Sequence, residues 1–187
     1  MIIIDPSLAR ESTRNRSAAG PSSATSPIQK PRRERIPASR TVSGFLRRAQ
    51  SALGLRGQVS VLLTTDKAIR KLNLQFRGLD KATDVLSFPA AGPVAAEVAG
   101  DLAISVPTAL RQATEQGHTL SMEIKVLVLH GLLHLAGFDH ETDSGQMARR
   151  ERALRARLGL PQGLIERANQ AALRPSRAEQ MARGARK

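Results

Sequence analysis

The spacing of hydrophobic positions changes repeatedly along the middle of the chain, which predicts helices interspersed with strands. Helical spacing is found in residues 45–53, 66–76, 107–116 and 144–158. Strand-like runs of β-branched or alternating residues occupy residues 59–64, 83–89 and 102–105. Residues 1–6 read as a short strand closed by a turn, and residues 90–99 as a loop of small residues. This mixture predicts a compact α/β or α+β domain.

One further helical segment, residues 124–135, is apolar nearly all round. A helix of this composition is expected to lie buried in the middle of the domain. Thr119 or Ser121 is placed to cap its start, as Asp66 is for the helix after the first internal strand, and Gly137 is placed to end it in a left-handed turn.

Composition then narrows the chemistry that this domain can perform. The 187 residues and 41% hydrophobic content fit one domain with a single core. The chain has no Cys, which excludes a disulfide framework, a thiolate zinc site, an iron–sulfur cluster and a cysteine nucleophile. Any metal must therefore be held by His, Asp or Glu. The absence of Trp and Tyr weakens a model in which bases stack on a row of aromatics.

The net charge of +13 is distributed unevenly. Residues 10–40 contain eight basic and two acidic residues, and residues 174–187 contain five basic and one acidic. We therefore expect a first strand in residues 1–9, a disordered Ser-, Pro- and Arg-rich insertion in 10–40, a folded domain in 41–173 and a flexible basic tail in 174–187. Most of the positive charge is thus expected outside the folded domain, where it raises RNA affinity without specifying a reaction.

The basic N-terminal segment also resembles an organellar transit peptide in composition. Against that reading, the chain opens with the strand-like run Met1 to Pro6 and not with an amphipathic helix. No run approaches the roughly 18 apolar residues of a membrane span. The expected location is cytoplasmic, with no membrane partner.

The strongest chemical signal is the spacing of the histidines His130, His134 and His140. The first two lie one turn apart on one helix face, and the turn at Gly137 lets the third approach from outside the helix. Three imidazoles with a fourth position open are typical of a catalytic zinc site. The alternative, two hydrogen-bonded histidines in an apolar helix, leaves the shared spacing unexplained and costs a few kcal/mol for each unpaired imidazole.

The same ligand spacing is found in metzincin proteases, where a Glu follows the first His and acts as general base. Here that position is Gly131. Without the carboxylate, peptide hydrolysis loses the group that deprotonates the attacking water. A protease is therefore disfavoured, and a Lewis acid that acts on another electrophile remains.

Four ordered blocks resemble the YbeY family of rRNA maturation factors and single-strand-specific metallo-endoribonucleases. They are residues 72–77 (LNLQFR), 83–89 (TDVLSFP), 100–105 (GDLAIS) and 130–140 (HGLLHLAGFDH), within a similarity that spans about residues 41–160. The sequence departs from the family in having Phe138 where Tyr is commoner, and in the length of the 10–40 segment.

The resemblance implies a single zincin-like α+β domain, with a small mixed sheet of about four strands and about five helices around a buried helix that carries the metal ligands. It implies one Zn²⁺ per chain on His130, His134 and His140, and Arg77 as the arginine of the cleft. A guanidinium suits a phosphate and its transition state, although Arg77 can also be read as the partner of Asp80 or Asp84.

Three further residues have two readings each. Asp84 and Ser87 either shape the cleft or fix the local backbone. Asp139 either supports a ligand or acts as base, or it only forms the turn. His118 has no assignment.

The resemblance implies a zinc-dependent endoribonuclease in 16S rRNA 3′ maturation and late ribosome quality control, with single-stranded rRNA, the small ribosomal subunit and an Era-type GTPase as partners. One alternative is a ribosome-assembly or binding factor whose zinc is mainly structural. Another is a metal hydrolase of a different substrate on the same histidines.

Overall fold

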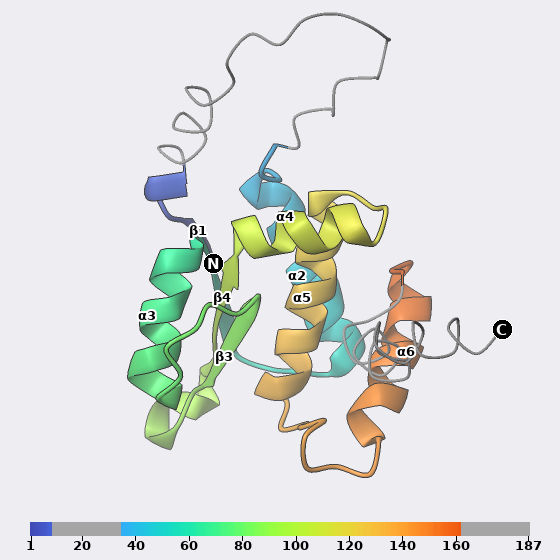
Figure 1. Cartoon of the computed structure of the whole chain (residues 1–187). Coiled ribbons are helices and arrows are strands. Elements are labelled where there is room, and N and C mark those ends of the chain that lie inside the picture. The colour runs from blue at the N-terminus through green and yellow to red at the C-terminus, as the bar shows by residue number, and fades with distance from the viewer. Residues whose placement is uncertain (9–34, 162–187) are drawn as a thin grey trace, which may run out of the picture.

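The protein is built around a four-stranded mixed sheet with helices on both faces (Figure 1). The computed structural model describes residues 1–8 and 35–161. The strands are β1 (Ile2–Ile4), β2 (Gln58–Thr64), β3 (Val85–Pro89) and β4 (Val98–Ser105), in the order β1-β2-β4-β3. β1, β2 and β4 are parallel, and β3 is antiparallel to β4.

Within the described residues, five α-helices and a 3-10 turn surround this sheet. They are α2 (Ser39–Leu53), α3 (Asp66–Arg77), η1 (Gly92–Ala96), α4 (Val106–Glu115), α5 (Leu120–Leu135) and α6 (Gln146–Leu158). The prediction of an α+β domain with about four strands and about five helices is thus confirmed. The predicted insertion lies largely outside the described residues and the tail entirely so; Ser39 and Arg40 already belong to α2.

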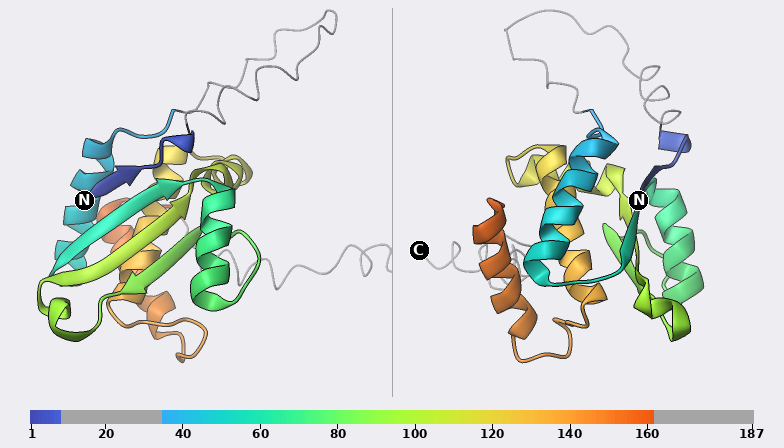
Figure 2. Two further views of the ribbon diagram at one scale, coloured as in Figure 1. Left: turned by 90° about the vertical axis from the view of Figure 1, so that its left-hand side faces the viewer. Right: turned by 180° about the vertical axis from the view of Figure 1, so that it is seen from behind.

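The main core lies between α5 and one face of the sheet. Inward positions alternate along β2 (Val59, Val61, Leu63) and β4 (Leu102, Ile104), as a strand with one face on a core requires. α2, α4 and α6 pack around α5 and complete the main core (Figure 2). Twelve residues of α5 are buried, which confirms the predicted central helix.

A smaller core holds α3 on the opposite face of the sheet. Ile69 packs there with Leu86 of β3 and Ala103 of β4. Since β3 also contacts α5, this edge strand lies between the C-terminal ends of α3 and α5. The two ends therefore face each other across β3, and this is where the sequence blocks 72–77, 83–89 and 130–140 meet.

Three predicted boundaries were wrong, each for a local reason. Thr65, not Asp66, caps α3, because its side chain accepts a hydrogen bond from Ala68 N at 3.2 Å. The carboxylate of Asp143 accepts from three backbone N–H groups, so α6 begins at Gln146 instead of Ser144. The predicted loop 90–99 contains η1 and the start of β4, because small residues there obscure the strand pattern.

Gly100 is required where β4 passes closest to β3. It has φ of 144°, and a Cβ built on it would lie 2.3 Å from the Phe88 carbonyl oxygen. We predict that Gly100→Ala lowers the free energy of unfolding by about 3 kcal/mol, because backbone atoms cannot move aside as a side chain can. Urea denaturation measures this difference.

Gly44→Ala provides the matched control for the Gly100 variant. Gly44 lies inside α2, and no atom lies within 4 Å of its built Cβ. This substitution should raise stability by about 0.5–1 kcal/mol, since alanine loses less backbone entropy on folding. Equal stability of the Gly100→Ala variant and the unaltered protein would contradict the close approach.

Candidate metal centre and cleft

Helix α5 carries two of the three clustered imidazoles. The Thr119 side chain caps the helix by accepting a hydrogen bond from Met122 N at 3.2 Å. His130 and His134 are one turn apart on the same helix face, and their Nε2 atoms lie 3.2 Å from each other. His130 is only 4% exposed, so packing restricts its ring to one orientation.

The third imidazole comes from the turn after α5. Gly137 adopts the predicted left-handed conformation with φ of 85°, and Phe138 N donates back to the last turn of the helix. The ring of His140 thereby lies 5.2 Å from that of His130 and 5.4 Å from that of His134. The ligand nitrogens of the three residues lie within 4.8 Å of one another, close enough for a single ion to reach all three.

Glu151 orients His130 from the buried side of α6. Its Oε1 lies 3.1 Å from His130 Nδ1, and the two side chains are 1% and 4% exposed. An ionised carboxylate only accepts hydrogen bonds, so the Nδ1–H of His130 donates to it. The lone pair of Nε2 is then directed at the cluster, which is the arrangement of metal-binding histidines that are supported by a carboxylate.

The imidazole of His134 is held in its neutral form. Burial, together with the neighbouring His130 and His140, lowers the pKa of His134 to about 4. At neutral pH its ring nitrogen therefore keeps a lone pair, and neutral imidazole is the form that binds metals. The donor set fits a divalent ion that is bound by three nitrogens.

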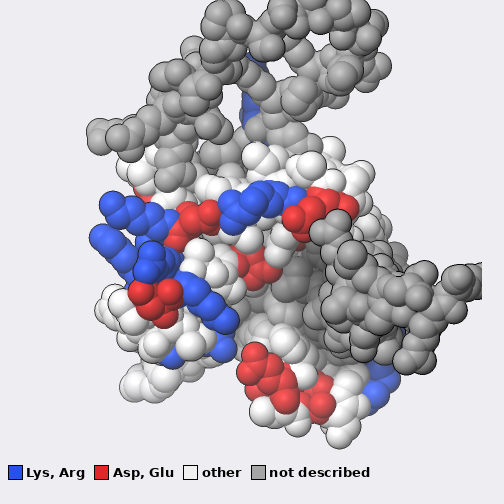
Figure 3. All heavy atoms as spheres, in the orientation of Figure 1, with Lys and Arg blue, Asp and Glu red and all other residues white. Residues whose placement is uncertain are grey.

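The three histidines line a cleft of about 890 Å³ between the end of α3, β3 and the chain after α5. In Figure 3 the molecular face is hollowed there, with basic side chains gathered over α3 and acidic ones below the hollow. Arg77, the last residue of α3, has an exposed side chain on this cleft. Neither acid considered as its partner pairs with it: Asp80 binds Arg70 at 2.6 and 2.7 Å, and Asp84 has other partners.

Asp84 lines the cleft and also fixes the backbone at the start of β3. Its carboxylate accepts from Val85 N at 2.8 Å, from the Thr83 hydroxyl at 3.1 Å and from Gln112 Nε2 of α4 at 2.9 Å. Ser87 also lines the cleft, with its Oγ 3.5 Å from the Gly131 carbonyl oxygen. The Asp84 side chain therefore lies on the cleft and also binds the local backbone, and its role in the site stays a prediction.

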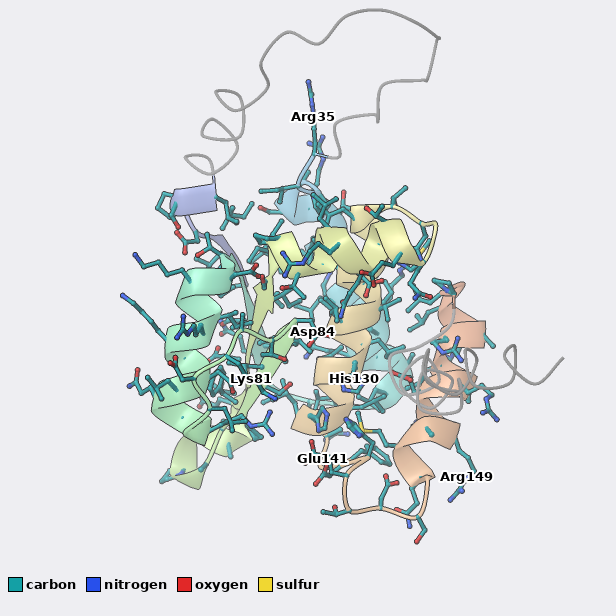
Figure 4. The ribbon with its side chains drawn as sticks, viewed as in Figure 1. Arg35, Lys81, Asp84, His130, Glu141 and Arg149 are labelled. Carbon is teal, nitrogen blue, oxygen red and sulfur yellow. The ribbon has the colours of Figure 1, made fainter. Side chains whose placement is uncertain are left out.

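Asp139 lies between the second and third histidines and organises the turn. Hydrogen bonds from Glu141 N and the Thr142 hydroxyl, with His134 and His140 nearby, hold its pKa below the usual range. A carboxylate of low pKa is a weak base. The hydrogen bonds of Asp139 therefore stabilise the turn. Figure 4 shows His130 on α5 between Asp84 and Glu141, which both line the cleft.

The fourth histidine, His118, is not part of this cluster. Its Nε2 lies 2.5 Å from Glu123 Oε2 at the start of α5, and that glutamate is fully buried. The pair gives this buried carboxylate a hydrogen-bond partner. Glu123 lies about three helical turns before His134, so the pair is outside the cluster.

Sequence reasoning missed Glu151, Phe76 and Glu141. Glu151 was detectable, because it falls on the same face of α6 as Met147 and Leu154, which are both buried. A lone acid on the apolar face of an Arg-rich helix needs a buried partner. The other two side chains are exposed at the cleft, and no periodicity marks such positions.

Comparison with known proteins finds a matching family model and several relatives, all of which carry one name. The family model described as Endoribonuclease YbeY matches residues 29–159. A protein named Endoribonuclease YbeY from Koribacter versatilis is 54% identical over 127 residues, which cover 68% of this chain and 82% of the relative. Its namesake from Solibacter usitatus is 52% identical over 126 residues, covering 67% and 83%. The chain belongs to the YbeY family.

A solved structure, the solution structure of TM1509 from Thermotoga maritima, is 27% identical and covers 67% of this chain and 85% of its own length, with a TM-score of 0.48. Within residues 1–8 and 35–161, no helix is both long enough and apolar enough to span a membrane.

In this member of the YbeY family, the position after the first histidine packs closely against the sheet. A Cβ on Gly131 would lie 2.7 Å from Leu102 Cδ2 and 3.2 Å from Ser87 Oγ, so the Leu102 side chain would have to shift to admit a side chain there. The glycine at this position suits the packing of α5 on β4.

Glu151 supplies a test of the metal centre in this YbeY-family chain. We predict that Glu151→Gln lowers zinc affinity about 10- to 100-fold, because a neutral amide holds the His130 Nδ1–H less strongly and makes Nε2 a weaker donor. Competition with a chromophoric chelator measures the affinity. Glu115→Gln, at the exposed end of α4, is the control and should leave it unchanged. An unaltered affinity in a folded Glu151→Gln variant would contradict the assigned contact.

Proposed function

We propose that the protein is a zinc-dependent endoribonuclease that cuts single-stranded ribosomal RNA, in 16S rRNA 3′ maturation and late ribosome quality control. The observation that carries the proposal is the convergence of three imidazoles and Arg77 on one open cleft. Membership of a family whose members are named Endoribonuclease YbeY supports the substrate class.

His130, His134 and His140 are the residues that would hold the ion. Zinc suits three neutral imidazoles, and a three-histidine set leaves a coordination position for substrate or water. When bound, the ion supplies Lewis-acid chemistry to a phosphodiester oxygen. Glu151 keeps His130 in the tautomer that binds metal.

Arg77 is proposed to hold the scissile phosphate. Its guanidinium lies on the cleft and is not engaged by Asp80 or Asp84, which bind other partners. A planar guanidinium can donate two hydrogen bonds to a phosphate, and the same contacts stabilise the charge that develops in the transition state. Arg77 therefore supplies a permanent positive charge at the cleft, which glycine and histidine side chains do not.

Phe76 supports a preference for single strands. Its side chain is 58% exposed beside Arg77 on the cleft, and its ring stands edge-on to Phe88 with centroids 5.1 Å apart. An exposed ring that a second ring holds in place offers a face on which an unpaired base can stack. A base inside a duplex cannot reach it. One exposed aromatic ring is therefore enough for an unpaired base to stack on, and a row of aromatic residues is not required.

The proposal extends to the surroundings in which such RNA is found. The small ribosomal subunit and an Era-type GTPase are the proposed partners, and the cytoplasm is the proposed location, because the substrate is ribosomal RNA. These follow from the family resemblance.

A second candidate is a ribosome-assembly factor whose metal is mainly structural. One observation favours it: the cleft carboxylates of Asp84 and Asp139 are both engaged in hydrogen bonds that fix the backbone, so neither is dedicated to a proton transfer. A folded His130→Ala protein that still supported ribosome maturation in cells would favour this candidate over the enzyme.

The central test compares Arg77→Ala with Arg70→Ala on an rRNA precursor. Both arginines are on α3, and Arg70 pairs with Asp80 away from the cleft. We predict that Arg77→Ala lowers kcat about 100-fold or more with zinc content unchanged, because a transition-state contact is lost. Arg70→Ala should cleave normally. Loss of zinc together with activity, or full activity without Arg77, would contradict the assigned role.

Metal removal tests the cofactor separately. A chelator should abolish cleavage, and added Zn²⁺ should restore it, because the histidines alone lack the Lewis acid. His134→Ala should remain inactive after zinc is added. His118→Gln, outside the cluster, should respond to zinc like the unaltered protein. Undiminished cleavage by the chelated protein would reveal a contaminating nuclease, and restoration by other ions but not zinc would overturn the choice of metal.

A further inference from the structure

The helices α2 and α6 carry a marked excess of positive charge on the side of the molecule behind the view of Figure 1. α2 has Arg40, Arg47 and Arg48 and no acidic residue. α6 has five arginines and one acid, Glu151, whose carboxylate is buried against His130. The two helices contact each other, as the right-hand view of Figure 2 shows. No surface carboxylate on either helix offsets this charge.

Two hollows lie on this basic surface, and the first of them is next to the cleft. The first, of about 570 Å³, is lined by Arg56 and Arg150 and shares Phe138 with the cleft of the three histidines. The second, of about 410 Å³, is lined by Arg47, Arg48 and Arg157 together with Ser51. Ser51 and Ala52 of the second hollow directly precede Leu53 of the first, so the two adjoin along α2.

We name Arg47, Arg48, Arg56, Arg150 and Arg157 the arginine track. All five side chains are exposed. None takes part in the ion pairs found within residues 1–8 and 35–161. Neither hollow is lined by an acidic residue. The track therefore presents guanidinium groups that no carboxylate of the described residues neutralises.

The helix dipole accounts for only part of this charge. Arg157 lies in the last turn of α6, where positive charge is favourable, and the Asp143 carboxylate offsets the positive end of that helix. Arg47, Arg48 and Arg150 lie outside the last turn of their helices, so the dipole does not favour them. An anionic ligand would give these three guanidinium groups a partner.

The ligand that fits is a nucleic-acid backbone and not a membrane surface. Membrane-binding helices combine basic side chains with exposed apolar ones. Among the described residues, the large exposed hydrophobic side chains all lie outside α2 and α6; they are Met1, Ile3, Ile4, Leu74, Phe76, Leu79, Val94 and Leu110. A row of guanidinium groups on helices with no large exposed apolar side chain suits successive phosphates, which Arg binds with paired hydrogen bonds.

We propose that the arginine track binds the phosphodiester backbone of single-stranded RNA outside the cleft and guides the strand along α2 and α6. This inference rests on the proposed function for the identity of the polyanion. Arg150 and Arg157 are two helical turns apart on one face of α6, about 10 Å along its axis. The track therefore contacts several nucleotides beyond the one that is cut, and long RNAs bind more tightly than short ones.

The test measures binding of a 4-nucleotide and a 20-nucleotide RNA by fluorescence anisotropy at several salt concentrations. Two double variants, Arg48→Gln/Arg157→Gln and Arg56→Gln/Arg150→Gln, remove two track charges each. The control, Lys67→Gln/Lys71→Gln, removes two exposed charges from α3. All are made in the zinc-bound full-length Arg77→Ala protein so that the RNA stays intact.

Each track variant should weaken binding of the long RNA roughly 10- to 30-fold near 0.1 M salt and lower the salt slope by about 1.4, because single strands give about 0.7 per phosphate contact. Binding of the short RNA should change less than twofold. The control should leave both affinities unchanged. Equal losses in control and track variants, or an unchanged slope in the track variants, would overturn the proposal.

Two more readouts separate this inference from the proposed function. Suppose that the protein with Arg77 intact does not cleave RNA, but that the track variants bind RNA more weakly than their parent protein. The proposed function is then wrong, and the proposed role of the track is supported. If the protein cleaves and the track variants bind normally, only the track fails. Loss of binding to vesicles of anionic phospholipid, with RNA binding unchanged, would assign the track to a membrane and overturn the proposal.

Discussion

The buried contact between His130 and Glu151 joins the metal centre to the rest of the fold. Helix α5 is the most apolar of the described helices, so an imidazole inside it must find a partner or destabilise the core. Glu151 is that partner on one side, and the histidine cluster lies on the other. Because Glu151 belongs to α6 and His140 to the turn between the two helices, the site forms only when α5 and α6 pack together. Folding and ligand geometry are therefore coupled through one hydrogen bond.

The sheet imposes the second constraint, through the close approach of α5 to β4. Gly131 faces Leu102 so closely that a larger residue would require the Leu102 side chain to shift, and glycine itself brings no side chain to the chemistry. The helix faces that remain for function are those of His130 and His134, which open toward β3 and the end of α3. Arg77 and Phe76 come from that end. The active groups thus come from opposite sides of β3 because the packing leaves no other face available.

Much of this arrangement could be predicted from sequence, because its signals are periodic or are fixed by spacing. The buried helix, its left-handed end at Gly137 and the histidine triad follow from residue order within a short window. The contact of Glu151 with His130 could not be derived in the same way, since it spans two helices and depends on how α6 rotates about its axis. Arg77 was selected by resemblance; only the tertiary structure shows that Asp80 and Asp84 are engaged elsewhere.

The distribution of charge within the described residues has a consequence for how RNA and metal depend on each other. Asp84, Asp139 and Glu141 line the cleft together with the three imidazoles, and Arg77 is the basic residue on that lining. Without an ion, such a surface repels a phosphate. Under the proposed function, a divalent ion held by the histidines would reverse the local balance, because it would be the largest charge in the site. The arginine track on α2 and α6 shares no residue with the cluster. Binding along the proposed track and engagement of the cleft would therefore be separable steps, and only the second would require the metal.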